Sequence, residues 1–273
     1  SNRPALFPLD EIIEAGPTAE NERGARRLAL RRALPARVLV PNLLTILALS
    51  AGLTGIRFAM QGRYELAVTL ILLAALLDGL DGRVARYMKG VSKLGAEMDS
   101  LADIVNFGVA PALMLYAWAL QDMRSPGWIA VLIYVVCCLL RLARFNVMNR
   151  EEEDSPDAKR FFVGVPAPAG AGLVLLPMFL YLAGWTGVQD LGPLIMVHLV
   201  LVGLLMVSRV PTFSFKKVLV PTDSIAFVLI AAVIVIAVLF TYPWYSMVAV
   251  TLVYMASIIV SWQTARRARY AKG

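Results

Sequence analysis

About eight long apolar runs dominate the sequence, and they constrain its fold more than any other feature. Each run is long enough to cross a hydrocarbon core about 30 Å thick, which takes ~20 helical residues. Because backbone groups in lipid must bond within their own segment, the runs are predicted to be helices. They lie near residues 38–60, 64–86, 95–120, 127–148, 164–185, 191–210, 222–241 and 244–262.

The composition excludes an ordinary water-soluble domain. Hydrophobic residues make up 59% of the chain, and its mean hydropathy is +0.70. Charged residues make up only 16%, against about 25% in soluble domains. One aqueous core cannot bury this apolar surplus, so lipid must cover it. We therefore predict an all-α integral membrane protein with about eight transmembrane helices.

Basic residues are distributed unevenly between the two sides of the predicted membrane. Of the 26 lysines and arginines, only Arg57, Arg63 and Arg124 fall on the side opposite the N-terminus. The positive-inside rule therefore predicts that both termini are cytoplasmic. We expect the protein to lie in the inner (plasma) membrane with its active site on the cytoplasmic side. The same distribution argues against nucleic acid as the reason for the net charge of +7.

The chain divides into three predicted segments. Residues 1–37 are predicted to form a cytoplasmic tail that ends in a basic amphipathic juxtamembrane helix on the lipid surface. Alternatively, its arginines serve only as a positive-inside anchor. Residues 38–210 form the core, and residues 211–273 hold a cytoplasmic loop, two C-terminal transmembrane helices and a basic tail. We expect Ser1 and Asn2 to be an expression scar, and residues 3–35 are too charged for a signal peptide.

Four aspartates flank the short turn between the second and third runs. Asp78 and Asp81 are three residues apart and Asp99 and Asp103 are four apart, so each pair shares one helix face. Ionisable groups at membrane depth are costly and usually mark function. Clustered carboxylates repel one another, and a divalent cation removes that conflict. With no nearby His or Cys, oxygen-only ligation favours Mg²⁺ or Mn²⁺.

A structural alternative is that these aspartates cap helix ends or pair with nearby basic side chains. That alternative accounts for one or two of them, but poorly for four in two registered pairs. Residues 78–103 read D-x2-D-G-x2-A-R-x8-G-x3-D-x3-D, which resembles the complete signature of the CDP-alcohol phosphatidyltransferases. The fixed positions are Asp78, Asp81, Gly82, Ala85, Arg86, Gly95, Asp99 and Asp103.

The resemblance implies a fold in which the first six helices enclose a polar cavity open to the cytoplasm, with residues 38–210 as the catalytic core. It also implies that the aspartates hold metal on the diphosphate of a CDP-lipid. The expected metal ligands are Asp78, Asp81, Asp99 and Asp103, and the candidate catalytic residues are Asp99 and Asp103, with Asp103 as the base. Gly82 and Ala85 would lie against the cytidine nucleotide.

Weaker features concern the acceptor alcohol. The stretches 99–112, 140–147, 161–172 and 207–217 are similar to the branch of the family that uses serine. The resemblance therefore implies CDP-diacylglycerol and serine as substrates, phosphatidylserine and CMP as products, and a homodimer. Two alternatives stay open: another acceptor, such as glycerol 3-phosphate or inositol phosphate, and a cation transporter, which would more often show broken helices and repeated halves.

Further candidate binding residues lie outside the motif. Arg141 and Arg144 share a helix face on which they can clamp a phosphate or a carboxylate, although each also suits an interface anchor. Asn106 lies one helical turn beyond Asp103. Its amide suits either a hydrogen bond to the acceptor alcohol or a helix–helix contact. His198, alone in its run, is expected to be a hydrogen-bonded packing residue. The full candidate binding set is Gly82, Ala85, Arg86, Gly95, Asn42, Arg141, Arg144, Asn106, Lys216 and Lys217.

Overall fold

The computed structural model describes residues 36–88, 92–154, 164–208 and 225–270. Every element within these ranges is helical, which confirms the predicted all-α class for this part of the chain. The main helices are α2 (Ala36–Met60), α3 (Tyr64–Met88), α4 (Lys93–Asp103), α5 (Ala110–Leu115), α6 (Arg124–Asp154), α7 (Ala167–Val174), α8 (Leu176–Leu182), α9 (Gly192–Val207), α10 (Ile225–Thr241) and α11 (Pro243–Tyr270).

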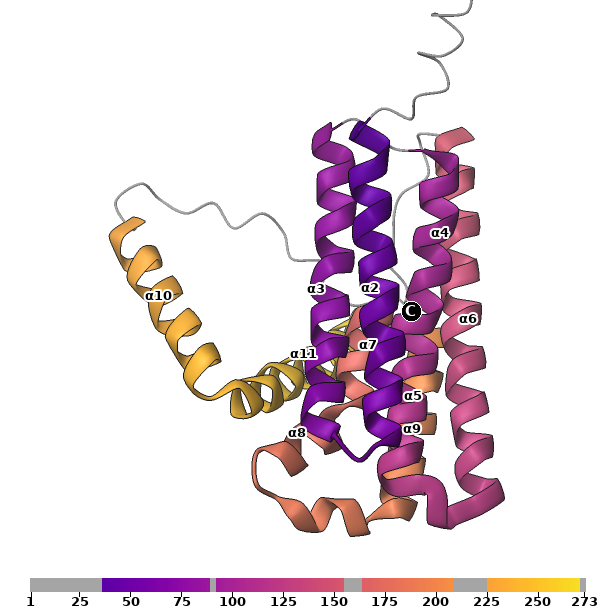
Figure 1. Ribbon diagram of the computed structural model, residues 1–273, viewed down its shortest axis with the longest axis vertical. Coiled ribbons are helices and arrows are strands. Elements are labelled where there is room, and N and C mark those ends of the chain that lie inside the picture. The colour runs from indigo at the N-terminus through magenta and orange to yellow at the C-terminus, as the bar shows by residue number, and fades with distance from the viewer. Residues whose placement is uncertain (1–35, 89–91, 155–163, 209–224, 271–273) are drawn as a thin grey trace, which may run out of the picture.

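The long helices α2, α3 and α6 and the run that contains α4 and α5 pack together in the body of the molecule (Figure 1). α2 packs along α3, and α6 packs along α9. The turn between α2 and α3 depends on Gly62, whose φ of 72° lies in the left-handed region that glycine favours. The two helices are therefore held antiparallel, and the end of α3 lies close to the beginning of α2.

The helical run from Leu94 to Met148 is 55 residues long, but it reverses direction. A single 3₁₀ turn, Gln121–Met123, precedes Arg124, whose φ of 48° is positive. After this turn α6 runs back along the preceding helices (Figure 1). The run therefore makes two antiparallel passes, as the separate runs 95–120 and 127–148 in the sequence predict.

The exterior of the molecule is strongly apolar. Within the described residues, three helical runs are long and apolar enough to cross a membrane: Leu39–Met60, Leu94–Met148 and Pro243–Ser261. α9 is apolar but shorter. On α10, large side chains such as Val233 and Phe240 are 65% and 81% exposed. An apolar surface of this extent needs lipid around it, whereas the count of eight spans stays a prediction.

The third helical run departs from α-helical geometry directly after Asp103, in the π-helix η2 (Ile104–Val109). Pro111 has no N–H to donate to the carbonyl of Phe107, four residues earlier. The hydroxyl of Tyr134 on α6 donates to that carbonyl instead, at 2.8 Å. π-Helical segments occur frequently at functional sites, and this one adjoins a candidate catalytic residue.

A second proline explains why the predicted run 164–185 is divided into α7 and α8 at Leu175. Pro177 has no N–H to donate to the carbonyl of Leu173, and Nε2 of His198 lies 2.8 Å from this oxygen. Because a carbonyl only accepts, Nε2 carries the proton. His198 is thus a hydrogen-bonded packing residue, as expected from the sequence.

Candidate active site

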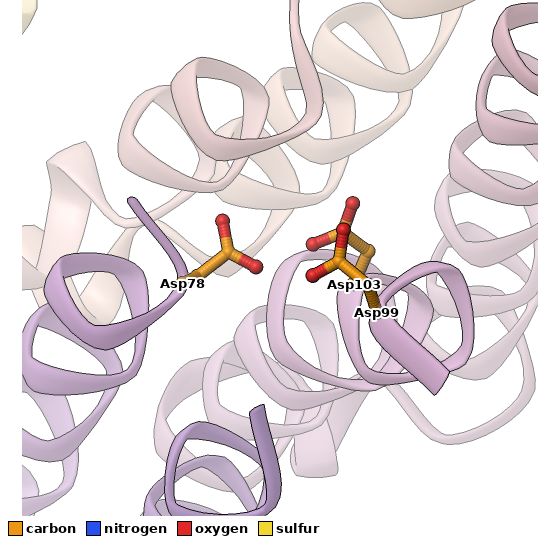
Figure 2. Close-up of side chains that lie close together, drawn as sticks. All are labelled: Asp78, Asp99 and Asp103. Atoms are coloured by element: carbon orange, nitrogen blue, oxygen red, sulfur yellow. The ribbon is translucent and has the colours of Figure 1, made fainter. Parts of the chain in front are cut away.

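Three of the four motif aspartates bring their carboxylates together. Asp78 on α3 points toward Asp99 and Asp103 on α4 (Figure 2). One carboxylate oxygen from each residue lies within 4.8 Å of the other two. The four-residue spacing of Asp99 and Asp103 puts both on one helix face, and the packing of the neighbouring helices supplies Asp78. We call Asp78, Asp99 and Asp103 the carboxylate cluster.

The carboxylate cluster suits a hard divalent cation. All three residues are half-buried and offer only oxygen. Oδ1 of Asp103 is buried and has no hydrogen-bond partner among the described residues. Negative charges at this separation repel, and a cation between them removes the repulsion. An oxygen-only donor set fits Mg²⁺ or Mn²⁺ better than zinc, which usually takes nitrogen or sulfur ligands.

Asp81 lies next to the carboxylate cluster but outside it. Its side chain is 4% exposed, and its Oδ2 accepts a 2.8 Å hydrogen bond from the hydroxyl of Thr45 on α2. Asp81 and Asp99 both line an adjoining cavity. Asp99 therefore belongs to the carboxylate cluster and to the cavity wall, whereas Asp81 borders only the cavity.

The cavity has a volume of about 180 Å³ and lies between α2, α3 and the beginning of α4. A Cβ atom added at Gly82 would meet no other atom within 4 Å, so the backbone there faces open space. Most fixed positions of the motif line this cavity, namely Asp81, Gly82, Ala85, Arg86, Gly95 and Asp99. The other lining residues are Pro41, Asn42 and Thr45 of α2 and Ser92 and Ala96 at the beginning of α4.

Gly95 is needed because α2 approaches α4 closely. A Cβ atom there would lie 2.6 Å from Oδ1 of Asn42 and 3.0 Å from Oγ of Ser92. Ser92 caps α4, and its Oγ accepts a 2.9 Å hydrogen bond from the backbone N–H of Gly95. Ser92 was not among the predicted site residues, although a serine directly before a helix is a recognisable N-cap signal.

The candidate arginines occupy three separate environments. Nε of Arg86 donates to the carbonyl of Gly82 at 3.0 Å, beside the cavity. Arg141 on α6 is half-buried and interacts electrostatically with Asp103. Arg144 is exposed, and its Nη1 donates to a backbone carbonyl at the C-terminal end of α9, at 3.2 Å. Arg141 therefore adjoins the carboxylate cluster, and Arg144 attaches α6 to α9.

Asn106 is fully buried in η2, and neither atom of its amide has a hydrogen-bond partner among the described residues. A Cβ atom added at Gly52 of α2 would collide with Oδ1 of Asn106. The amide is therefore directed at α2, which is the helix–helix position that the sequence also allows. Lys216 and Lys217 lie outside the described residues.

Comparison with known proteins gives a consistent result. A model of the CDP-alcohol phosphatidyltransferase family matches residues 38–207. The CDP-diacylglycerol--serine O-phosphatidyltransferase of Mycobacterium leprae (strain TN) is 42% identical over 233 residues, which cover 84% of this chain and 75% of that protein. The protein of the same name from Helicobacter pylori (strain J99) is 38% identical over 185 residues, covering 66% and 74% of the two chains. The archaetidylserine synthase of Methanothermobacter thermautotrophicus is 37% identical over 150 residues, covering 54% and 60%.

Proposed function

Because the chain belongs to the CDP-alcohol phosphatidyltransferase family, we propose that it transfers the phosphatidyl group of CDP-diacylglycerol to the hydroxyl of serine and releases CMP. The observation that carries the chemistry is the convergence of the carboxylate cluster beside a cavity lined by the rest of the motif. The choice of serine is supported by the names of the relatives, all three of which refer to serine.

The carboxylates and the cavity suggest how the substrates are bound. Asp78, Asp99 and Asp103 would hold Mg²⁺ or Mn²⁺, with Asp81 at the edge of the site. When bound, the cation neutralises the diphosphate and the charge that develops on the leaving CMP. The cytidine nucleotide would occupy the cavity beside Gly82, where the open backbone lets a bulky group approach.

In the proposed reaction Asp103 accepts the proton of the serine hydroxyl. The hydroxyl oxygen attacks the β-phosphorus in line and forms the new P–O bond. The bond between the β-phosphorus and the bridging oxygen breaks, and CMP leaves with that oxygen. Arg141 is near enough to Asp103 to interact with it electrostatically, so its guanidinium can hold the serine carboxylate during the attack.

The membrane arrangement belongs to the same proposal. The chain is an integral membrane protein, and we infer that all eight apolar runs span the inner membrane with both termini on the cytoplasmic side. The first six would enclose the polar cavity, so that serine enters from the cytoplasm and the CDP-lipid from the inner leaflet. The uneven distribution of lysine and arginine supports this orientation. The homodimer stays a prediction.

A panel of acceptor alcohols tests the proposal. CMP release from CDP-diacylglycerol is measured with serine, glycerol 3-phosphate, inositol phosphate and ethanolamine, with Mg²⁺ or Mn²⁺ present. We expect the kcat/KM for serine to exceed the others by about 100-fold or more, because a site built to bind the serine carboxylate leaves its own polar groups unpaired with acceptors that lack a carboxylate. Faster release with glycerol 3-phosphate would reassign the acceptor. Metal flux into liposomes without CDP-lipid would favour the transporter.

A further inference from the structure

Tyr254 brings a polar group toward the site from outside the region that defines the family. It lies on α11, whereas the family model matches residues 38–207. Its side chain packs against the hydrophobic core, and α11 contacts α7 and α8. The Tyr254 hydroxyl is nevertheless buried, with no hydrogen-bond partner among the described residues. An unpaired buried hydroxyl is unfavourable, so a ligand is the natural partner.

Arg141 links this hydroxyl to the carboxylate cluster. The half-buried guanidinium interacts electrostatically with both Asp103 and Tyr254. It also lies 5.7 Å from the ring of Phe145, which orients it by a cation–π contact. Oδ1 of Asp103 is buried and has no partner among the described residues either. Two buried oxygens without hydrogen-bond partners among the described residues therefore belong to residues that both interact with one arginine.

The chemistry of these groups matches an amino acid that carries a hydroxyl. A guanidinium and a phenol hydroxyl both donate hydrogen bonds, and a carboxylate accepts from both at once. Asp103 accepts a proton, as the attack of a hydroxyl requires. In serine only two carbon atoms separate the hydroxyl oxygen from the carboxylate carbon. Serine therefore carries its hydroxyl and its carboxylate close together, which matches a proton acceptor and a guanidinium that interact with each other.

We propose that Tyr254 is a specificity-determining residue, whose hydroxyl donates a hydrogen bond to the carboxylate of the serine that Arg141 holds. This inference rests on the proposed function, and it gives α11 a part in acceptor selection. A packing tyrosine alone would use its ring, and its hydroxyl would be better replaced by hydrogen than buried without a partner. The hydroxyl is therefore the atom to test.

Tyr254→Phe removes one oxygen and keeps the ring that packs against the core. The full-length variant is assayed in detergent micelles for CMP release, with serine and CDP-diacylglycerol varied in turn. We expect the KM for serine to rise about 10-fold or more, since a hydrogen bond to a charged group is lost. The KM for CDP-diacylglycerol and the thermal midpoint should stay within twofold and about 2 °C of wild type. Tyr245→Phe, on an exposed tyrosine of the same helix, is the matched control and should change nothing.

A second measurement separates recognition from packing. If Tyr254 and Arg141 hold the same carboxylate, the increases in serine KM caused by Tyr254→Phe and Arg141→Lys should be less than multiplicative in the double variant. An unchanged serine KM in Tyr254→Phe, or equal increases for both substrates, would overturn the role of Tyr254 and leave the serine reaction intact. If the wild-type chain releases no CMP with serine, the proposed function itself fails.

Discussion

The hydroxyl of Thr45 on α2 donates a 2.8 Å hydrogen bond to Oδ2 of Asp81 on α3, across 36 residues of sequence. Both side chains are buried, at 5% and 4% exposure. A buried carboxylate needs partners because transfer from water without them is unfavourable. The bond therefore fixes one oxygen of Asp81 and ties the beginning of α2 to the motif, next to the cavity that both residues line.

The first prediction concerns this bond. Thr45→Val keeps the shape of the side chain but leaves Asp81 without its donor, so the free energy of unfolding should fall by about 1–3 kcal/mol. CMP release should fall about 10-fold, because Asp81 loses its fixed orientation at the cavity wall. Thr45→Ser keeps the hydroxyl and should retain most of the stability and most of the rate of CMP release. Wild-type activity and stability in Thr45→Val would show that the bond has no role in the site.

The second prediction concerns the close approach of α2 and α4. In Gly95→Ala the new Cβ would lie 2.6 Å from Oδ1 of Asn42, so the Asn42 side chain must move away from the cavity wall or the two helices must shift. We expect a loss of about 1–3 kcal/mol in unfolding free energy, measured by thermal or denaturant unfolding, together with a raised KM for CDP-diacylglycerol. Gly172→Ala is the matched control, because a Cβ there meets nothing within 4 Å. If both variants behave alike, the close contact is not what requires glycine.

The third prediction tests the base. Asp103→Asn keeps the size of the side chain but removes its ability to accept a proton. The rate of CMP release should fall by about 10² to 10⁴, whereas binding of CDP-diacylglycerol, measured separately by calorimetry at saturating Mg²⁺ or Mn²⁺, should persist. Asp122→Asn, on an exposed residue of another cavity, should have wild-type rates. Full turnover by Asp103→Asn would show that Asp103 is not the general base.

Much of the fold follows from local features of the sequence. Apolar length alone predicts the helical runs, and the three- and four-residue spacings of the aspartates predict which carboxylates share a face. The π-helix η2 was not predicted, and neither was the hydrogen bond by which Tyr134 of another helix reaches the carbonyl of Phe107 within it. Helix ends also differ from the apolar runs: α6 continues to Asp154 and α11 to Tyr270. Apolarity marks where lipid ends, whereas a helix can continue into water.

The site was less predictable wherever it depends on contacts between distant segments. Spacing suggests that Arg141 and Arg144 act together, but helix packing brings Arg141 toward Asp103 and Arg144 to the end of α9. Similarly, the spacing of Asp78 and Asp81 does not predict that the hydroxyl of Thr45 donates a hydrogen bond to Asp81. Tyr254 carries no sequence signal at all, since a tyrosine in an apolar run is typical of lipid-facing and core helices alike.

Mn²⁺ titration of the full chain, followed by electron paramagnetic resonance, tests most directly whether Asp78, Asp99 and Asp103 together bind a divalent cation. We predict that wild-type protein, stripped by chelation, loses CMP release, binds Mn²⁺ and regains activity. Replacing Asp78 and Asp99 by asparagine should weaken Mn²⁺ binding at least ~10-fold, because affinity follows the ligand charge. The control pair Asp122→Asn and Asp190→Asn, at a different cavity, should bind as wild type. Undiminished Mn²⁺ binding by the first pair, or full activity after exhaustive chelation, would contradict the proposed cation site.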